Sequence, residues 1–191
     1  MEGRKRIGLA MCGSYCTYSQ VFDAAERLAE KYELVPIMSE NAAATDSRFG
    51  AASEHIKRLM LMTGKKVVTS IVDAEPLGPS QPMEAMLIAP CTGNTLAKLA
   101  HGITDSAVTM AAKAHLRNGR PLVIALSTND GLSGSAENIA RLLNRKSVYF
   151  VPFGQDDPMK KPNSLQADFS LLYDALEAAM AGRQLQPVLV R

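Results

Sequence analysis

The fold is decided by the stretch Met86-Leu87-Ile88-Ala89-Pro90-Cys91-Thr92-Gly93-Asn94-Thr95, in which an apolar run meets a turn of small and polar residues. The apolar residues 86–89 predict a short strand that is buried on both faces. The Ala/Leu-rich residues that follow Thr95 predict a helix. In an open α/β sheet such a junction lies at the edge where ligands bind, because backbone N–H groups and small side chains converge there. The stretch therefore predicts an α/β fold and a first place to look for chemistry.

Outward from this stretch, apolar runs of strand length alternate with segments whose apolar residues recur at helical spacing. Strands are expected at 7–11, 33–38, 86–89, 122–126 and 148–151, with a weaker candidate at 66–72. Helices are expected at 20–31, 48–63, 95–100, 106–118, 135–144 and 167–181. Such alternation predicts a doubly wound parallel sheet that is covered by helices on both faces.

Length and composition limit the possible classes of protein. The 191 residues suit one well-buried domain, 1–191, and are few for two independent cores. Within it, the proline-rich residues 152–165 should form an extended connection to the last helix, 167–181. The net charge is only +2 and the charges are interspersed, so no nucleic-acid partner is indicated. No apolar run approaches the roughly 20 residues of a membrane span and no cleavage-site pattern is seen, so we expect a cytoplasmic protein without a membrane partner.

The cysteines predict neither a disulfide framework nor a metal site. There are three, Cys12, Cys16 and Cys91, an odd number and too few for a stapled scaffold, so free thiols in a reducing compartment are expected. Cys-x3-Cys with one distant cysteine matches no strong metal signature. We predict no metal, and a redox role of the thiols stays open.

Four predicted strands end in small or polar residues. These ends are 12–19, 38–41 with Ser39, 90–95 and 127–131. Glycine lets the backbone approach a ligand closely, hydroxyl groups donate to phosphate oxygens, and a helix N-terminus favours an anion. The first loop alone is a weak signal, because it lacks the dinucleotide and P-loop motifs and a cluster of N-capping residues explains it equally well. Since the four ends lie along one edge of the sheet, together they predict one extended ligand with a phosphate and a polar ring.

The turn at 90–95 resembles the signature Pro-Ala-Ser-Ala-Asn-Thr of the flavoprotein family of homo-oligomeric flavin-containing cysteine decarboxylases. The proline, the asparagine and the Thr-Leu-Ala-Lys continuation are shared. Further blocks along almost the whole chain resemble a dipicolinate-forming branch of that family, and several blocks in order are more specific than one motif. These blocks are 13–18, 45–50, 74–79, 88–94, 116–121, 127–131, 151–156 and 160–164.

The resemblance implies a Rossmann-like or flavodoxin-like three-layer α/β/α fold, an FMN-type site and a homo-oligomer. By carry-over, Gly13, Ser14 and Ser39 would hold the phosphate, and Asn94 would contact the flavin. The other cofactor-binding candidates are Pro90, Thr92, Ser106, Thr109 and Ser127.

The resemblance also implies an oxidoreductase activity, the oxidation of a dihydrodipicolinate-type intermediate to dipicolinate, a spore constituent, during sporulation. The implied partners are a small dicarboxylate substrate and an A subunit that resembles nicotinamide dehydrogenases and carries NAD(P). Arg48, Lys160 and Lys161 are the cations that we expect to hold the two ring carboxylates, although exposed lysines usually face solvent. Which of the two proteins passes the hydride, and which residues are catalytic, stay open.

One departure from the family bears on the chemistry. Its decarboxylases carry a histidine in a His-Ile-x-Leu stretch before the signature strand, where this chain has Ala74-Glu75-Pro76-Leu77. Without a histidine between 56 and 100, the acid/base group at that position is missing. An FMN-dependent cysteine-type decarboxylase is therefore the weaker alternative. A noncatalytic protein that supports the A subunit is another.

Overall fold

The structure is a computed structural model that describes residues 3–190. In these residues, one sheet contains β1 (Arg6–Met11), β2 (Glu33–Met38), β3 (Ala85–Cys91), β4 (Leu122–Thr128), β5 (Val148–Phe150), β6 (Phe153–Gly154) and β7 (Leu165–Ala167). The α-helices are α1 (Tyr18–Lys31), α2 (Glu40–Ala44), α3 (Ala52–Thr63), α4 (Ile71–Ala74), α5 (Gly93–His101), α6 (Ala107–Leu116), α7 (Ala136–Leu143) and α8 (Leu172–Met180).

The sheet has a parallel part and a short antiparallel extension. The parallel strands run in the order β2-β1-β3-β4, with β5 beside β4. From β1 the chain first adds β2 on one side and then β3 on the other, so the winding direction reverses between β1 and β3. A reversal of this kind opens a crevice at the carboxyl ends of the two strands, which is where open α/β sheets bind ligands.

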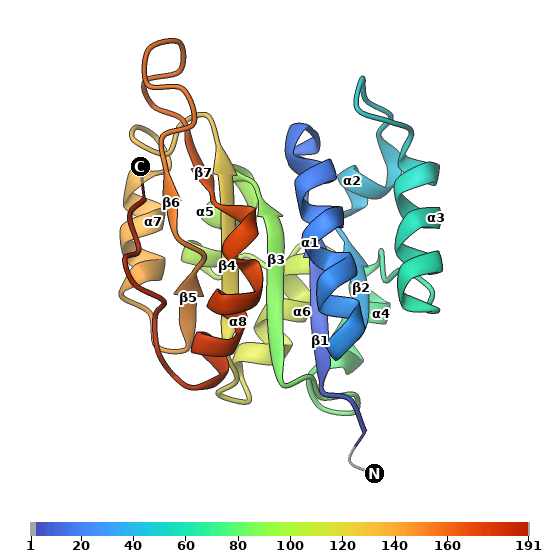
Figure 1. The fold of residues 1–191 in the computed structure, drawn as a ribbon. Helices are drawn as coiled ribbons and strands as arrows, with labels where there is room; N and C mark the ends of the chain where they lie inside the picture. Colours follow the sequence, from blue (N-terminus) through green and yellow to red (C-terminus); the bar gives the residue numbers. More distant parts are fainter. Residues whose placement is uncertain (1–2, 191) are drawn as a thin grey trace.

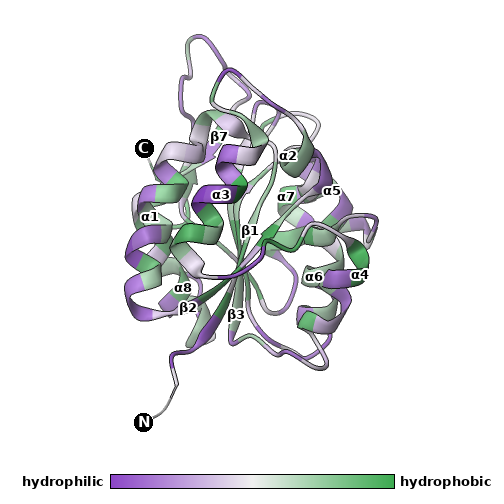
Figure 2. Cartoon of the chain, turned by 90° about the vertical axis from the view of Figure 1, so that its right-hand side faces the viewer, coloured by the Kyte–Doolittle hydropathy of each residue, from purple (hydrophilic) through white to green (hydrophobic). Residues whose placement is uncertain are grey.

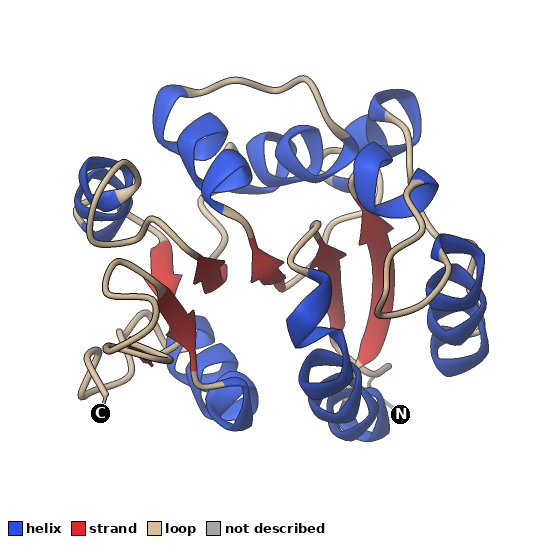
Figure 3. Ribbon diagram, turned by 90° about the horizontal axis from the view of Figure 1, so that it is seen from above, coloured by secondary structure: helices blue, strands red, loops and turns tan. Residues whose placement is uncertain are grey.

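Helices cover both faces of the sheet, which confirms the predicted three-layer α/β/α architecture (Figures 1 and 3). Helices α1 and α8 lie on one face, whereas α4, α5, α6 and α7 lie on the other, and α3 packs beside β2. Figure 2 shows the hydrophilic side of α1 turned outward. Every residue of β3 is buried, as expected for a strand that is covered on both faces.

Two local predictions are wrong. Residues 66–72 form no strand, because Val68 makes only an isolated bridge to Ile37 before the Ser70 side chain caps α4. The helix expected at 48–63 begins at Ala52, since residues 47–50 form a tight turn whose two ends exchange backbone hydrogen bonds. β-Branched valines at 67 and 68 favour a strand, but only Val68 bonds to β2, which is too little pairing for a strand.

The segment 152–165 adds β6 to the sheet and then makes turns at 158–160 and 162–163. Strand β7 follows at its end and pairs antiparallel with the end of β4, with Ser127 opposite Gln166. The last helix is shorter than 167–181, because a 3-10 turn at Phe169–Leu171 precedes α8. No helix in residues 3–190 combines the length and the apolar character that crossing a bilayer would need.

Candidate functional site

A cavity of 570 Å³ lies at the reversal between β1 and β3. Five segments of the chain meet there, from the carboxyl ends of β1, β2 and β3, from the start of α4, and from α5 with its connection to α6. Its walls contain Cys12, Gly13, Ser39, Glu40, Asn41, Ile71, Thr92, Asn94, Thr95, Lys98, Asp105 and Ser106. We call it the switch-point cavity.

Three helices have their N-cap residue in the wall of the switch-point cavity, and each of these N-caps is a hydroxyl side chain. Ser39 Oγ accepts from the backbone N–H of Ala42 at 3.3 Å, which caps α2. Thr92 Oγ1 caps α5 through the N–H of Thr95 at 3.2 Å. Ser106 caps α6 in the same way. Because a helix N-terminus carries a partial positive charge and exposed N–H groups, three of them around one cavity favour an anionic ligand.

The loop after β1 is held against the two neighbouring strands. Ser14 Oγ donates to the carbonyl of Ser127 at the end of β4, at 2.8 Å. The backbone N–H of Cys12 donates to the Pro90 carbonyl at 3.2 Å, and Tyr18 fixes the same loop by donating to the Cys12 carbonyl. These contacts position Gly13 at the cavity wall with its backbone accessible.

The charged groups of the cavity are already engaged. Glu40 Oε1 accepts from the backbone N–H of Ala107, at 2.9 Å, and so adds a second cap to α6. Lys98 Nζ lies 2.8 Å from an Asp105 carboxylate oxygen. The hydrogen bond from Lys98 lowers the pKa of Asp105, so this carboxylate stays ionised at neutral pH. The cavity wall thus combines hydroxyl and backbone groups at Gly13, Ser39 and Thr92 with the carboxylate of Glu40 and the Lys98–Asp105 ion pair.

The thiols near the cavity are neutral at neutral pH. Burial raises the pKa of Cys12 to about 11, and Thr95 Oγ1 lies 3.3 Å from its sulfur. Burial also raises the pKa of Cys91 well above its ordinary value. Cys16 is exposed, and all three cysteines are free. Within residues 3–190, no group of three or more His, Cys, Asp or Glu side chains is placed to hold a metal ion.

The structure brings five of the nine cofactor-binding candidates together. Gly13, Ser39, Thr92, Asn94 and Ser106 all line the switch-point cavity. Three others, Ser14, Ser127 and Pro90, lie outside the wall and hold the loop after β1 in place. The Ser14 hydroxyl donates to the Ser127 carbonyl, and the Pro90 carbonyl accepts from the Cys12 N–H. Thr109 lies one turn further along α6, where its Oγ1 is 2.8 Å from Ser106 Oγ.

Sequence reasoning missed the charged residues of the cavity. Glu40 stands next to Ser39, and Lys98 lies one turn beyond Asn94, so both fall close to predicted site residues. Asp105 precedes the N-cap Ser106, and the spacing of Ser106 and Thr109 is that of a capping box. This capping-box spacing is the feature of the sequence that could have predicted a helix start at the ligand edge of the sheet.

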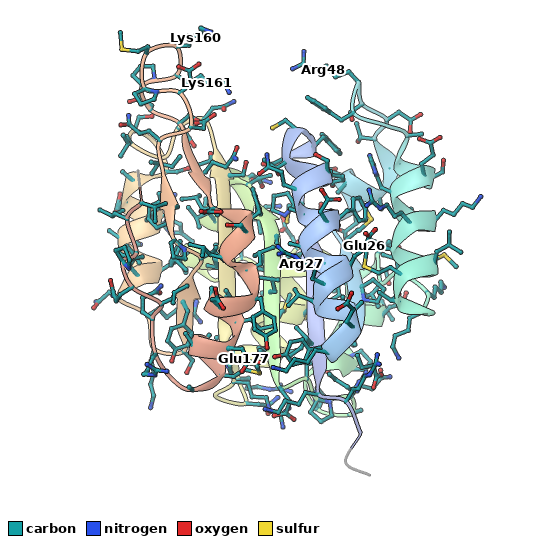
Figure 4. The ribbon with its side chains drawn as sticks, viewed as in Figure 1. Glu26, Arg27, Arg48, Lys160, Lys161 and Glu177 are labelled. Atoms are coloured by element: carbon teal, nitrogen blue, oxygen red, sulfur yellow. The ribbon has the colours of Figure 1, made fainter. Side chains whose placement is uncertain are left out.

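The three candidate substrate-binding cations lie outside the cavity wall. Figure 4 shows Arg48 on one loop and Lys160 and Lys161 on another, with both loops rising above the ligand edge on opposite sides. The Arg48 guanidinium lies over the ring of Phe49, 4.8 Å from its centroid. Lys161 pairs with Asp156 at 3.0 Å.

No histidine of the described chain lines the switch-point cavity. His55 packs edge-on against Tyr18, and His115 is buried with its Nε2 2.9 Å from the Pro121 carbonyl. His101 is exposed at the end of α5. The site therefore lacks an imidazole that could move a proton during decarboxylation.

Comparison with known proteins agrees with this geometry. The family model described as Flavoprotein matches residues 1–180. The B subunit of dipicolinate synthase from Bacillus subtilis (strain 168) is 49% identical over 187 residues, which cover 97% of this chain and 94% of that protein. The crystal structure of the corresponding B subunit from Bacillus halodurans C superposes with a TM-score of 0.90 at 46% identity, over 98% of this chain and 96% of that one.

A more distant structure shares the fold. The FMN-dependent cysteine decarboxylase SpaF has a TM-score of 0.65 at 22% identity, over 93% of this chain and 95% of that one. The resemblance predicted from the turn at 90–95 and from the longer blocks is thereby confirmed.

Proposed function

We propose, since the chain belongs to the flavoprotein family, that its switch-point cavity binds FMN and that it serves as the B subunit of an enzyme forming dipicolinate. The observation that carries the cofactor assignment is the convergence of three capped helix N-termini and the Gly13 loop on one cavity. Similarity to the Bacillus subtilis dipicolinate synthase chain along 97% of this one supports the activity.

The residues at the cavity match the chemical needs of FMN. Gly13 and Ser39 would hold the phosphate, because they offer backbone and hydroxyl groups in the cavity wall beside a helix N-terminus, and Ser14 would join them with its backbone N–H while its hydroxyl stays bonded to Ser127. Asn94 is exposed in the cavity wall and offers an amide to a polar ring. The volume of 570 Å³ falls within the roughly 300–1,000 Å³ of small-molecule sites.

The proposed reaction removes two hydrogens from a dihydropyridine dicarboxylate. A hydride leaves one ring carbon and a proton leaves the ring, so the product is the aromatic dicarboxylate. Bound flavin, or NAD(P) on the A subunit, supplies the hydride acceptor. This chain would position the substrate, with Arg48, Lys160 and Lys161 as partners for the ring carboxylates. Among the described residues no histidine lines the cavity, so the proton would leave to water, to a carboxylate of the cavity wall or to a group of the A subunit.

The same residues give less support to a cysteine-type decarboxylase. Among the described residues the cavity has no histidine, and burial raises the pKa of Cys12, which keeps this thiol protonated at neutral pH. The likeness to SpaF shows a common fold. Release of carbon dioxide from a peptidyl-cysteine substrate would nevertheless reverse this preference.

A fluorescence titration with FMN and a reconstituted assay test the proposal. The purified chain is titrated with FMN, and flavin fluorescence is followed. Quenching that saturates, together with a roughly tenfold loss of affinity in Ser39→Ala, would support the FMN site. Ser53→Ala is the matched control, because Ser53 is exposed on α3 and remote from the cavity wall. Absence of any flavin binding would overturn the cofactor assignment.

Dipicolinate formation is then measured with this chain alone, with the A subunit alone and with both together. Product that requires both proteins and is reduced by Ser39→Ala supports a catalytic flavin-binding role. Product that requires this chain but is unaffected by Ser39→Ala indicates a noncatalytic role. The mass of each species in light scattering would show whether the chain forms the homo-oligomer that we also propose.

A further inference from the structure

A second cavity lies on the α5–α6 side of the sheet, away from the carboxyl edge of β1 and β2. Its volume is 350 Å³, and it is bounded by the end of α5, the connection to α6, the outer side of α6 and the residue after Asn144. Apolar side chains of Leu99, Ile103 and Leu116 contribute to its wall. Three cations, Lys113, Arg117 and Arg145, belong to the same wall. We call it the basic cavity.

The three cations are available to a ligand. Within residues 3–190, none of them forms an ion pair with a carboxylate. Lys113 and Arg117 are four residues apart at the end of α6, so they project from the same side of the helix, where like charges repel. Arg145 is anchored over the cavity, because its Nη1 donates to the Leu99 carbonyl at 3.2 Å. An anion between them would relieve the repulsion.

The basic cavity and the switch-point cavity share the wall formed by residues 102–106. Gly102, Ile103 and Thr104 line the basic cavity, whereas Asp105 and Ser106 line the other. The backbone N–H of Ile103 donates to the Lys98 carbonyl at 2.9 Å, which holds the start of this wall. The two sites are therefore neighbours with separate sets of side chains.

We propose that the basic cavity binds a small aromatic dicarboxylate. Two carboxylates match two guanidinium groups and an ammonium group, and guanidinium groups bind carboxylates in bidentate geometry. A single ring matches the apolar part of the wall, and 350 Å³ is near the lower end of volumes for small-molecule sites. The choice of a dicarboxylate that resembles the product rests on the proposed function, whereas the existence of an anion site does not.

Isothermal titration calorimetry with pyridine-2,6-dicarboxylate tests the proposal on the full chain without the A subunit. The double variant Lys113→Gln/Arg117→Gln should weaken binding about tenfold or more. Lys146→Gln is the matched control, since Lys146 is exposed beside Arg145 but does not line the cavity, and it should change affinity by less than about twofold. Inorganic phosphate, which has no apolar body, should bind more weakly than the dicarboxylate.

Several outcomes would overturn the assignment. Absence of measurable binding would do so, as would equal affinity in the double variant and the wild type. Binding that is lost in Asn94→Ala but kept in the double variant would place the ligand in the switch-point cavity. If the double variant fails to give a native circular dichroism spectrum, Arg117→Gln alone supplies the comparison.

Light scattering separates a ligand site from an interface between copies of the chain. A mass that falls when Lys113 and Arg117 are changed would show that a second copy covers the basic cavity, and this would overturn the proposal. The calorimetric result does not depend on flavin or on the A subunit. Failure of dipicolinate formation would therefore leave a positive binding result standing.

Discussion

The switch-point cavity and the basic cavity lie on either side of residues 102–106 and differ in the kind of side chain that forms their walls. In the first, Ser39, Thr92 and Ser106 are short side chains that are already tied to helix backbones. In the second, Lys113 and Arg117 are long, exposed side chains on a helix surface. Groups tied to the backbone hold a ligand in one geometry, whereas flexible cations select for charge. One fold can thus place a geometry-selective site and a charge-selective site about one loop apart.

The largest effect should come from adding a side chain at Gly93, which lies between Thr92 and Asn94 of the switch-point cavity and does not line the basic cavity. A Cβ atom there would lie 2.6 Å from Thr128 Oγ1 and 2.8 Å from Ser135 Oγ. Gly93→Ala should therefore lower the free energy of unfolding by about 1–3 kcal/mol and weaken FMN binding. Urea denaturation and flavin titration would measure the two effects.

Gly134→Ala is the control for that change, because its added Cβ would meet only Asp130 Oδ2, at 3.2 Å. Pyridine-2,6-dicarboxylate binding should stay the same in both variants. If Gly93→Ala were as stable as the wild type and bound FMN equally well, the packing of the α5 start against the β4 loop would not matter to the site.

A smaller effect is expected from Ser106→Ala, which lies in the wall that the two regions share. The change removes the Oγ that accepts from the Thr109 N–H, at 3.2 Å, and so breaks the capping box of α6. The expected loss is about 1 kcal/mol in the free energy of unfolding. Both ligands should bind more weakly, and Ser53→Ala should change neither. A loss of affinity for only one of the two ligands would show that the shared wall does not connect the sites.

Acidification should lower the free energy of unfolding through His115, a buried residue of α6. Helix α6 also forms part of the basic cavity, so this region should be affected more than the switch-point cavity. Burial lowers the pKa of His115 below its ordinary value of 6.5. Below pH 6.5 the unfolded chain takes up a proton that the folded chain resists, so stability should be full above 6.5 and fall as the pH drops toward the folded pKa. Urea denaturation between pH 7.5 and 5 would measure the slope.

His115→Gln should make that slope shallower without abolishing it, since burial also lowers the pKa of His55. The salt-bridged carboxylates do not interfere, because the lowered pKa values of Asp105 and Asp156 place their titration at more acidic pH. An unchanged slope in His115→Gln would assign the pH dependence elsewhere.

The smallest effect on either cavity is expected from Arg48→Glu, because Arg48 lines neither of them. Stability, FMN binding and pyridine-2,6-dicarboxylate binding should stay within error of the wild type. In the complex with the A subunit, the KM for substrate should rise about two- to fivefold, as expected for loss of an exposed ionic contact. Lys57→Glu, an exposed change on α3, supplies the control. An unchanged KM would remove Arg48 from the substrate site.

The sequence predicts strands and helices correctly where their apolar patterns are long, and it fails to predict them where they are short. Strands β1 to β5 and the longer helices were found because their buried faces repeat over several residues. Strands β6 and β7 have two and three residues, too few to show a period, and their pairing with each other and with β4 depends on contacts distant in the chain.

The two cavities also differ in how far the sequence could predict them. The switch-point cavity could be predicted because small residues at several strand ends must meet at one edge of a parallel sheet. The role of Glu40 could not, since its hydrogen bond to Ala107 spans 67 positions and follows no local motif. The basic cavity was also missed, because Lys113 and Arg117 on α6 meet Arg145 only through packing of α5 against both α6 and α7.

The hydrogen bond from Ser14 to the Ser127 carbonyl joins parts of the chain that are synthesised at different times. Its two partners are 113 positions apart, so a growing chain leaves the ribosome with its first ligand loop long before the strand that holds this loop has been synthesised. During translation the loop after β1 therefore lacks its hydrogen bond to the end of β4. This contact can form only after β4 has been synthesised, about two thirds of the way along the chain.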